Sequence, residues 1–191
     1  MKRIVIFASG SGTNMERIAE FFQSSHNVKI ILVVCNKVGA GVIGRAEKME
    51  IPVMIIDKPS FYNTNLLSEK LLEMQTDLIV LAGFLWLVPS HLLHAFPNRI
   101  INIHPALLPK FGGKGMYGEK VHEAVIAAGE KYSGITIHYV NEHYDSGDIL
   151  FQKSFEIALN ETPASLAARI HVLEHTHFPK VIDDFLKTKI K

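Results

Sequence analysis

Short apolar runs rich in β-branched residues recur along the first hundred residues of the chain. They cover residues 4–8, 28–35, 52–56, 78–82 and 100–103. Each run is apolar at successive positions, so both faces of the strand that it predicts would be buried. This pattern is typical of parallel strands covered on both sides.

Stretches with helical spacing lie between these runs. The first carries apolar residues at the i, i+3, i+4, i+7 positions Met15, Ile18, Ala19 and Phe22, which indicates an amphipathic helix. A second predicted stripe consists of Leu66, Leu67, Lys70, Leu71 and Met74. Alternating strands and helices predict an α/β fold, with a Rossmann-like open, mostly parallel sheet and helices on both faces. Binding sites in such sheets lie beyond the carboxyl ends of the strands.

The pattern changes after residue 104. Residues 105–118 contain two prolines and four glycines without periodicity, so we expect a loop or lid there. A helix is predicted over 119–128, with Gly129 as its terminator. Alternating residues predict strands at 135–139 and 149–157. Thr162 and Pro163 then form an N-cap and first-turn signal for a long helix toward Phe185. The fold should therefore end in an added strand pair and a long helix.

Composition limits the class of protein. The 191 residues are enough for one good core, so we expect a single domain over 1–191. The net charge of +1 indicates neither a nucleic-acid-binding surface nor a polybasic membrane anchor. Cys35 is the single cysteine and predicts neither a disulfide nor a metal site. The first apolar run is too short for a membrane span or signal peptide, which favours a cytoplasmic protein. Monomer and homodimer remain equally open.

The segment Ser9-Gly10-Ser11-Gly12-Thr13-Asn14 joins the first strand to the first helix. Glycines allow a tight turn there, and free N–H groups at a helix N-terminus attract a phosphate. A dinucleotide fingerprint would need glycine at Met15 and an acidic residue near Asn36, and a P-loop would need lysine. The remaining choices are a phosphate site or a glycine-rich turn without a ligand.

Asn102 and His104 end the strand before the 105–118 loop. Residues two apart in a strand point to the same side, so both side chains would face the cleft. An amide and a titratable imidazole in one cleft are suited to acyl-transfer chemistry. Asp145 follows the predicted strand at 135–139. It would favour the protonated form of His104 if the two met, but Asp-x-Gly is also an ordinary turn sequence.

Three motifs together resemble glycinamide ribonucleotide formyltransferases, which belong to the folate-dependent formyltransferases of purine synthesis. They are the phosphate loop, the stretch Asn102-x-His104-Pro105-x-Leu107-Leu108-Pro109, and the segment from Gly134 to Tyr144-Asp145-x-Gly147. The resemblance implies formyl transfer from 10-formyltetrahydrofolate to the amine of glycinamide ribonucleotide without a metal. It implies that Asn102, His104 and Asp145 are catalytic, with Asn102 and protonated His104 stabilising an oxyanion.

The resemblance also implies two binding regions. The ribonucleotide would meet Gly12, Thr13 and Asn14 through its phosphate, and His171 and Glu174 on the last helix. The folate would lie in a slot formed with Asn102 and Asp145 by two walls, Leu81, Phe84, Leu85, Trp86, Leu87 and Val88 on one side and Val140, Asn141, Glu142, His143 and Tyr144 on the other.

The chain departs from the family pattern at two places. Trp86 stands where many members carry an arginine for the folate glutamate tail, and neither Asn63 nor Thr64 supplies a second basic residue. The glycine-rich loop at 111–118 is longer than usual.

The remaining histidines carry weaker predictions. His138 belongs to a matched motif. A role behind the catalytic residues and a purely structural role are about equally supported for it. His122 and the others lack metal-ligand spacing and are expected at the surface or at caps.

Several alternatives are open on the residues alone. Methionyl-tRNA formyltransferase would carry a further C-terminal domain and a basic surface, and formyltetrahydrofolate hydrolase an N-terminal regulatory domain. A phosphate or nucleotide sensor would use the same loop without needing His104. A dinucleotide-dependent oxidoreductase is disfavoured by the missing fingerprint residues.

Overall fold

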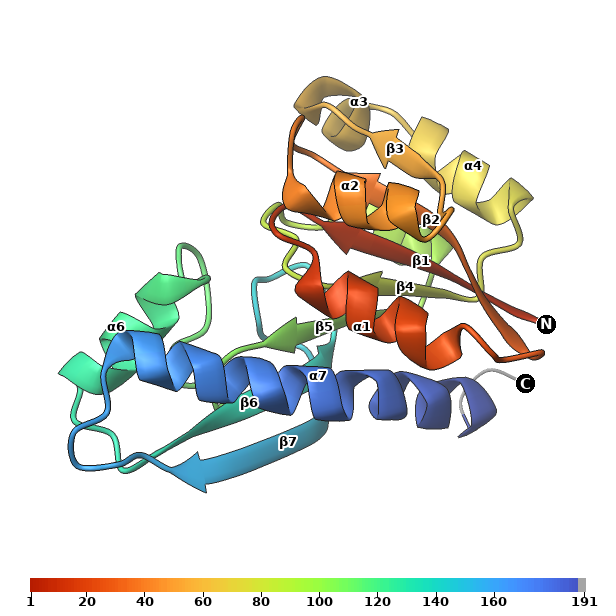
Figure 1. The fold of residues 1–191 in the computed structure, drawn as a ribbon. Coiled ribbons are helices and arrows are strands. Elements are labelled where there is room, and N and C mark those ends of the chain that lie inside the picture. The colour runs from red at the N-terminus through yellow and green to blue at the C-terminus, as the bar shows by residue number, and fades with distance from the viewer. Residues whose placement is uncertain (189–191) are drawn as a thin grey trace.

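A computed structural model of the chain, which describes residues 1–188, contains one seven-stranded sheet (Figure 1). The strands lie in the order β3-β2-β1-β4-β5-β6-β7. Neighbours from β3 to β5 are parallel, and β6 and β7 are added antiparallel. The strand bounds are β1 Lys2–Ala8, β2 Val28–Cys35, β3 Val53–Ile55, β4 Leu78–Leu81, β5 Ile100–His104, β6 Tyr132–Tyr139 and β7 Ile149–Glu156. The predicted α/β fold with an added strand pair is confirmed.

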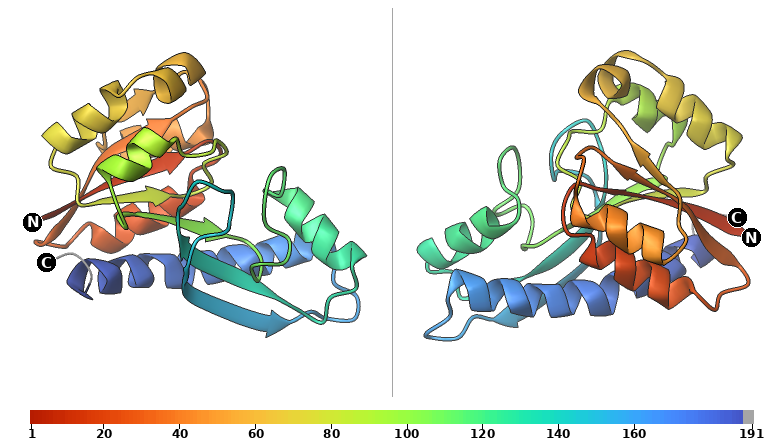
Figure 2. Two further views of the ribbon diagram at one scale, coloured as in Figure 1. Left: turned by 180° about the vertical axis from the view of Figure 1, so that it is seen from behind. Right: turned by 45° about the horizontal axis from the view of Figure 1, so that its top comes forward.

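Helices cover both faces of the sheet. Those on one face are α1, α2, α6 and α7, and those on the other are α3, α4 and α5 (Figure 2). The helix bounds are α1 Thr13–Phe22, α2 Gly41–Lys48, α3 Lys58–Asn63, α4 Leu66–Glu73, α5 Ser90–Ala95, α6 Glu119–Ala127 and α7 Pro163–Thr188. None of the helices within residues 1–188 is long and apolar enough to cross a membrane.

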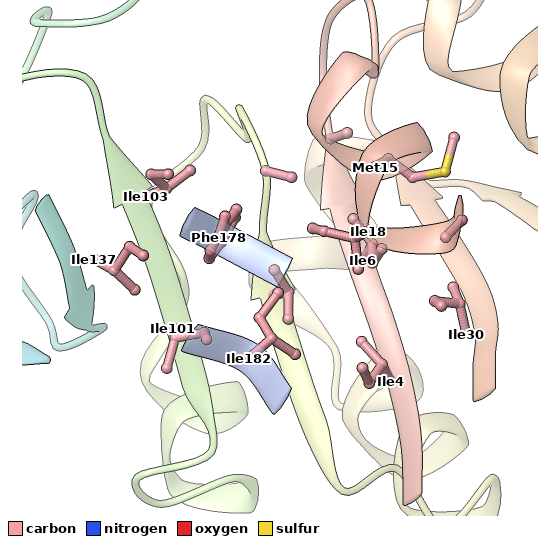
Figure 3. Close-up of a cluster of buried hydrophobic side chains, with 14 of the residues drawn as sticks. Ile4, Ile6, Met15, Ile18, Ile30, Ile101, Ile103, Ile137, Phe178 and Ile182 are labelled. Carbon is pink, nitrogen blue, oxygen red and sulfur yellow. The ribbon is translucent and has the colours of Figure 1, made fainter. Parts of the chain in front are cut away.

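The sheet has a hydrophobic core on each side because its strands alternate. In β1, Ile4 and Ile6 pack on one face and Val5 and Phe7 on the other, and all four are fully buried. Figure 3 shows Phe178 of α7 among the isoleucines of the core on the face that α1, α2, α6 and α7 cover. Burial on both faces explains why the strand sequences are continuous apolar runs.

The sequence predicts the helix α1 and its buried face correctly. Met15, Ile18, Ala19 and Phe22 are its buried residues. The stripe predicted for α4 is partly wrong, because Leu66 is 66% exposed while the face that packs inward contains Ser68. A polar serine between leucines obscured that face. Leu66 is the first residue of α4 and does not pack against the sheet.

The long helix α7 links the core to the cleft. Its N-terminus is capped as expected, since the Ser165 backbone N–H donates to Thr162 Oγ1 over 3.1 Å. The helix runs alongside α1 (Figure 1). Its C-terminal half buries Phe178 and Ile182, while Glu174, one turn earlier, is buried at the level of the phosphate loop.

Candidate active site

A cavity of about 680 Å³ lies beyond the carboxyl ends of β1, β4 and β5. Its walls come from the loop after β1, the segment after β4, the end of β5, the loop before α6 and the inward faces of α6 and α7. This is the position expected for a binding site in an open parallel sheet. All three predicted catalytic residues and all five predicted ribonucleotide-binding residues line it.

The loop after β1 has the geometry of an anion site. Gly12 adopts a left-handed backbone conformation (φ 82°) at the N-cap of α1, and no side chain caps the helix. A Cβ at this position would lie 2.6 Å from the Cα of Val42, so only glycine fits without displacing the loop. The first-turn N–H groups of α1 are therefore left to face an anion in the cavity.

Glu174 joins the phosphate loop to the last helix. Its Oε2 accepts from Asn14 Nδ2 over 2.9 Å and lies 3.1 Å from His171 Nδ1. The hydrogen bond to this carboxylate raises the pKa of His171, against the effect of partial burial. A cation is thus favoured near the uncapped helix N-terminus, where an anionic ligand would benefit from it.

The end of β5 places Asn102 and His104 in the cavity wall, and pairing with β6 brings Asp145 to them. The register is antiparallel, with His104 opposite Thr136 and Ile101 opposite Tyr139, so the connection after β6 returns over the end of β5. His104 Nδ1 lies 3.5 Å from Asp145 Oδ2, and Asn102 Nδ2 donates to Asp145 Oδ1 over 3.3 Å. The structure therefore contains the contact between His104 and Asp145 that the sequence left open.

The backbone of the connection is fitted closely to β6. Asp145 has a left-handed conformation with φ 51°, which aspartate tolerates in turns. A Cβ on Gly147 would lie only 1.8 Å from the Tyr139 carbonyl oxygen. Asp145 is thus a turn residue and a cavity residue at once.

Two backbone groups of the glycine-rich loop fix His104 and Asp145. The Phe111 carbonyl oxygen lies 2.7 Å from His104 Nε2, and the Gly113 N–H donates to Asp145 Oδ2 over 3.0 Å. A carbonyl oxygen can only accept, so Nε2 carries a proton in either charge state. Nδ1, beside Asp145, is therefore the ring atom that gains or loses the titrating proton.

The charge state of His104 differs from the expectation. Burial lowers the pKa of His104, which is only 3% exposed, and this effect outweighs Asp145 and the Phe111 carbonyl, which both raise it. The lowered pKa favours the neutral imidazole at pH 7, which has a free lone pair on Nδ1. For Asp145, burial opposes ionisation, but His138, His104 and the Gly113 N–H together lower its pKa. A neutral base beside an ionised carboxylate is the resting arrangement.

His138 lies directly behind these groups, which favours the role left open for it. Its Nδ1 is 2.7 Å from the Tyr139 carbonyl oxygen and therefore carries the proton. Its Nε2 is 3.1 Å from Asn102 Nδ2 and 3.7 Å from Asp145 Oδ1. In neutral His138, Nε2 accepts from the Asn102 amide and holds it in place.

The two predicted folate walls meet the cavity only in part. Phe84, Leu85, Tyr144 and Asp145 line it, together with Asn102. The other predicted wall residues do not line it: Leu81, Trp86, Leu87, Val88, Val140, Asn141, Glu142 and His143. Leu81 and Val88 are buried instead in the core between the sheet and the helices α3, α4 and α5. Trp86 packs in an aromatic group with Phe61, at 5.5 Å between ring centroids, and lies under the Lys58 ammonium at 5.9 Å.

The surface prediction for His122 is wrong. The side chain is 3% exposed and lines the cavity. Val121, His122 and Val125 form the buried face of α6, and the two valines, four residues apart, were the available signal that this face packs inward. Because histidine is polar, the sequence alone favours a position at the surface for it. Within residues 1–188, no group of three or more histidine, cysteine or acidic side chains has the arrangement of a metal site.

Comparisons with known proteins identify the family of the chain. Residues 2–182 match the family model described as formyl transferase. A curated chloroplastic phosphoribosylglycinamide formyltransferase of Arabidopsis thaliana is 42% identical over all of this chain and 67% of its own length. The enzyme of that name from Bacillus subtilis is 39% identical over 97% of this chain and 95% of its own.

A solved structure gives the same result for the fold. The crystal structure of phosphoribosylglycinamide formyltransferase from Bacillus halodurans superposes with a TM-score of 0.87 at 37% identity, over 100% of this chain and 97% of that one. The family model spans nearly the whole chain, and the sequence and structural relatives agree with it. On this evidence, together with the cavity described above, the chain belongs to the formyl transferase family.

Proposed function

We propose that the chain is a single-domain phosphoribosylglycinamide formyltransferase of purine synthesis. It would transfer the formyl group of 10-formyltetrahydrofolate to the amine of N1-(5-phosphoribosyl)glycinamide. The observation that carries this proposal is one cavity with an uncapped helix N-terminus on one wall and a buried base, His104, on another. A phosphorylated amine fits both features, and the names of the relatives agree.

Two sets of residues support binding of the ribonucleotide. The N–H groups of Gly12, Thr13 and Asn14 would hold its phosphate. His171 would add positive charge, and Glu174 would accept hydrogen bonds from sugar hydroxyls. Because Asn14 donates a hydrogen bond to Glu174 over 2.9 Å, the proposed phosphate and sugar positions would be adjacent.

The folate would occupy the part of the cavity nearest Phe84, Leu85 and Tyr144. Its formyl carbon must lie near His104 and Asn102 for the reaction to occur. Trp86 takes part in the aromatic packing behind Phe84, at 6.1 Å between centroids. We assign it a supporting role for this wall.

The chemistry requires one proton to move from the attacking amine to the departing N10. The amine forms a bond to the formyl carbon, and the carbonyl oxygen becomes an oxyanion. Nδ1 of neutral His104 accepts the amine proton, and ionised Asp145 stabilises the imidazolium that forms. Collapse of the intermediate breaks the bond to N10, which takes up the proton. The products are the formamide and tetrahydrofolate.

Asn102 is the candidate donor to the oxyanion. Its amide nitrogen already faces two acceptors, His138 Nε2 at 3.1 Å and Asp145 Oδ1 at 3.3 Å. Donation to the oxyanion therefore requires one of these contacts to be exchanged for the ligand. If the contact to Asp145 is the one exchanged, the proton that His104 accepts supplies a positive charge beside the carboxylate.

Release of tetrahydrofolate, followed by absorbance in the presence and absence of the ribonucleotide, tests this function. We expect release only when 10-formyltetrahydrofolate and the ribonucleotide are both present. Release without the ribonucleotide would identify a hydrolase. No release in either mixture would leave the phosphate sensor as the better description.

Replacing Gly12 by alanine should weaken ribonucleotide binding. The added methyl group meets the Val42 backbone at 2.6 Å, and the φ of 82° is strained for alanine, so the phosphate loop must shift. We expect the KM for the ribonucleotide to rise about tenfold or more, equivalent to roughly 1.4 kcal/mol, with the folate KM nearly unchanged. Steady-state kinetics with each substrate varied will check this.

Gly44→Ala is the matched control for that variant. Gly44 lies in α2, the helix that Gly12 approaches, and a Cβ there meets nothing within 4 Å. Alanine in a helix interior is favourable, so both KM values should be retained. An equal rise of both KM values in Gly12→Ala would indicate general damage to the fold and contradict a phosphate-binding role.

A further inference from the structure

His122 is a buried polar side chain that the reaction scheme leaves unused. It lies in the first turn of α6, is 3% exposed and lines the cavity. Its Nδ1 is enclosed and has no hydrogen-bond partner among residues 1–188. Because Nδ1 is enclosed, Nε2 is the ring nitrogen of His122 that a ligand in the cavity can reach.

His122 shares the cavity with the residues of the proposed sugar position. Glu174 and His171 of α7 line the same cavity, and α6 packs against α7. His122 therefore lies on the helix next to the one that carries the proposed sugar-binding residues.

The two ring nitrogens of His122 are in different surroundings. Burial lowers the pKa of this imidazole, so one nitrogen carries a hydrogen and the other a lone pair at pH 7. An enclosed N–H without a partner is rarer than an enclosed lone pair without one. The hydrogen therefore belongs on Nε2, which is not among the enclosed atoms. His122 presents an N–H donor to the cavity.

Glu174 provides the complementary acceptor. Its Oε2 is occupied by Asn14 and His171, while no residue among 1–188 hydrogen-bonds to its Oε1. A hydroxyl group can donate to a carboxylate and accept from an N–H at the same time. The chemistry of this corner therefore fits a sugar hydroxyl.

We propose that His122 is a specificity-determining residue, whose Nε2–H donates to a ribose hydroxyl of the ribonucleotide while that hydroxyl donates to Glu174. The proposal rests on the proposed function for the identity of the ligand. It makes the site selective for ribose over deoxyribose, because removal of the hydroxyl leaves both protein groups without a partner.

Two substitutions separate this role from simple packing. His122→Leu keeps most of the volume without a polar atom, and His122→Gln keeps an N–H donor near the position of Nε2. We expect His122→Leu to raise the ribonucleotide KM about tenfold, equivalent to one lost hydrogen bond, with kcat changed less than threefold. His122→Gln should retain a KM within threefold of the wild-type value.

Calorimetric titration with ribose 5-phosphate and its 2-deoxy and 3-deoxy analogues gives a second readout that needs no catalysis. The wild-type protein should prefer ribose 5-phosphate over at least one analogue by about tenfold, and His122→Leu should lose that preference. His94→Leu is the control, because His94 is an exposed histidine of α5 away from the cavity, and it should keep the preference.

The outcomes are distinct for the two proposals. Equal weakening of all three sugar phosphates by His122→Leu, or an unchanged preference, would overturn the role of His122. Absence of formyl transfer by the wild-type protein would overturn the proposed function, yet the titration would still report on His122. Melting temperatures of the variants will show whether a loss of binding reflects unfolding.

Discussion

His104→Ala is expected to lower kcat for formyl transfer by about 10²–10⁴-fold, the range typical of losing a positioned general base. Nδ1 of His104 is the one ring atom free to take the amine proton, since Nε2 is held by the Phe111 carbonyl at 2.7 Å. Alanine removes that acceptor and the imidazolium that Asp145 would stabilise. Single-turnover kinetics with saturating substrates will measure the effect on chemistry separately from binding.

Ribonucleotide affinity should change much less than kcat in the same variant. In the proposed mechanism His104 acts most strongly in the transition state, whereas Gly12, Asn14 and Glu174 would supply the ground-state contacts. A titration of the ribonucleotide into His104→Ala should give a Kd within about threefold of the wild-type value. A large loss of affinity with unchanged kcat would contradict the assignment of His104 as the base.

Asp145→Asn should reduce kcat by about a hundredfold, because the variant loses a charge that supports the general base. Asparagine keeps the shape of the side chain, and its oxygen can still accept from the Gly113 N–H. What it removes is the negative charge 3.5 Å from His104 Nδ1. The imidazolium formed during proton transfer then has no counter-charge in a buried site.

The pH dependence of Asp145→Asn gives the sharper test. His104 must be neutral to accept a proton, so kcat/KM rises with pH through its pKa. Burial places that pKa below its usual value, while Asp145 raises it. The acid limb of the wild-type profile should therefore lie below about pH 6.5, and it should move to still lower pH in Asp145→Asn. A limb that stays in place or moves upward would show that another group controls it.

Local patterns along the chain were sufficient for most of the fold. The parallel strands and α1 follow from residue periodicity, because burial on both faces or on one helical stripe leaves a clear signal. The helices α2, α3 and α5 carried no such signal. They are six to eight residues long and bury one or two side chains each, so their patterns do not exceed those of loops.

The candidate site depended more on tertiary structure. The contact between Asp145 and His104 requires the antiparallel register of β5 and β6. The sequence indicates only that the two strands could be neighbours, and it does not give their register. The neutral state of His104 depends on how deeply it is buried, and the sequence does not contain that depth. The burial of His122 does not follow from the sequence for the same reason, because it depends on how α6 packs against α7.

The most direct test of the account is the fate of an isotopic label. Purified protein is incubated with 10-[¹³C]formyltetrahydrofolate and the ribonucleotide, and the products are examined by carbon NMR and mass spectrometry. The account predicts that the label appears as a formamide on the glycinamide nitrogen and that His104→Ala abolishes most of this signal. Label recovered as free formate, or an unlabelled ribonucleotide, would contradict it.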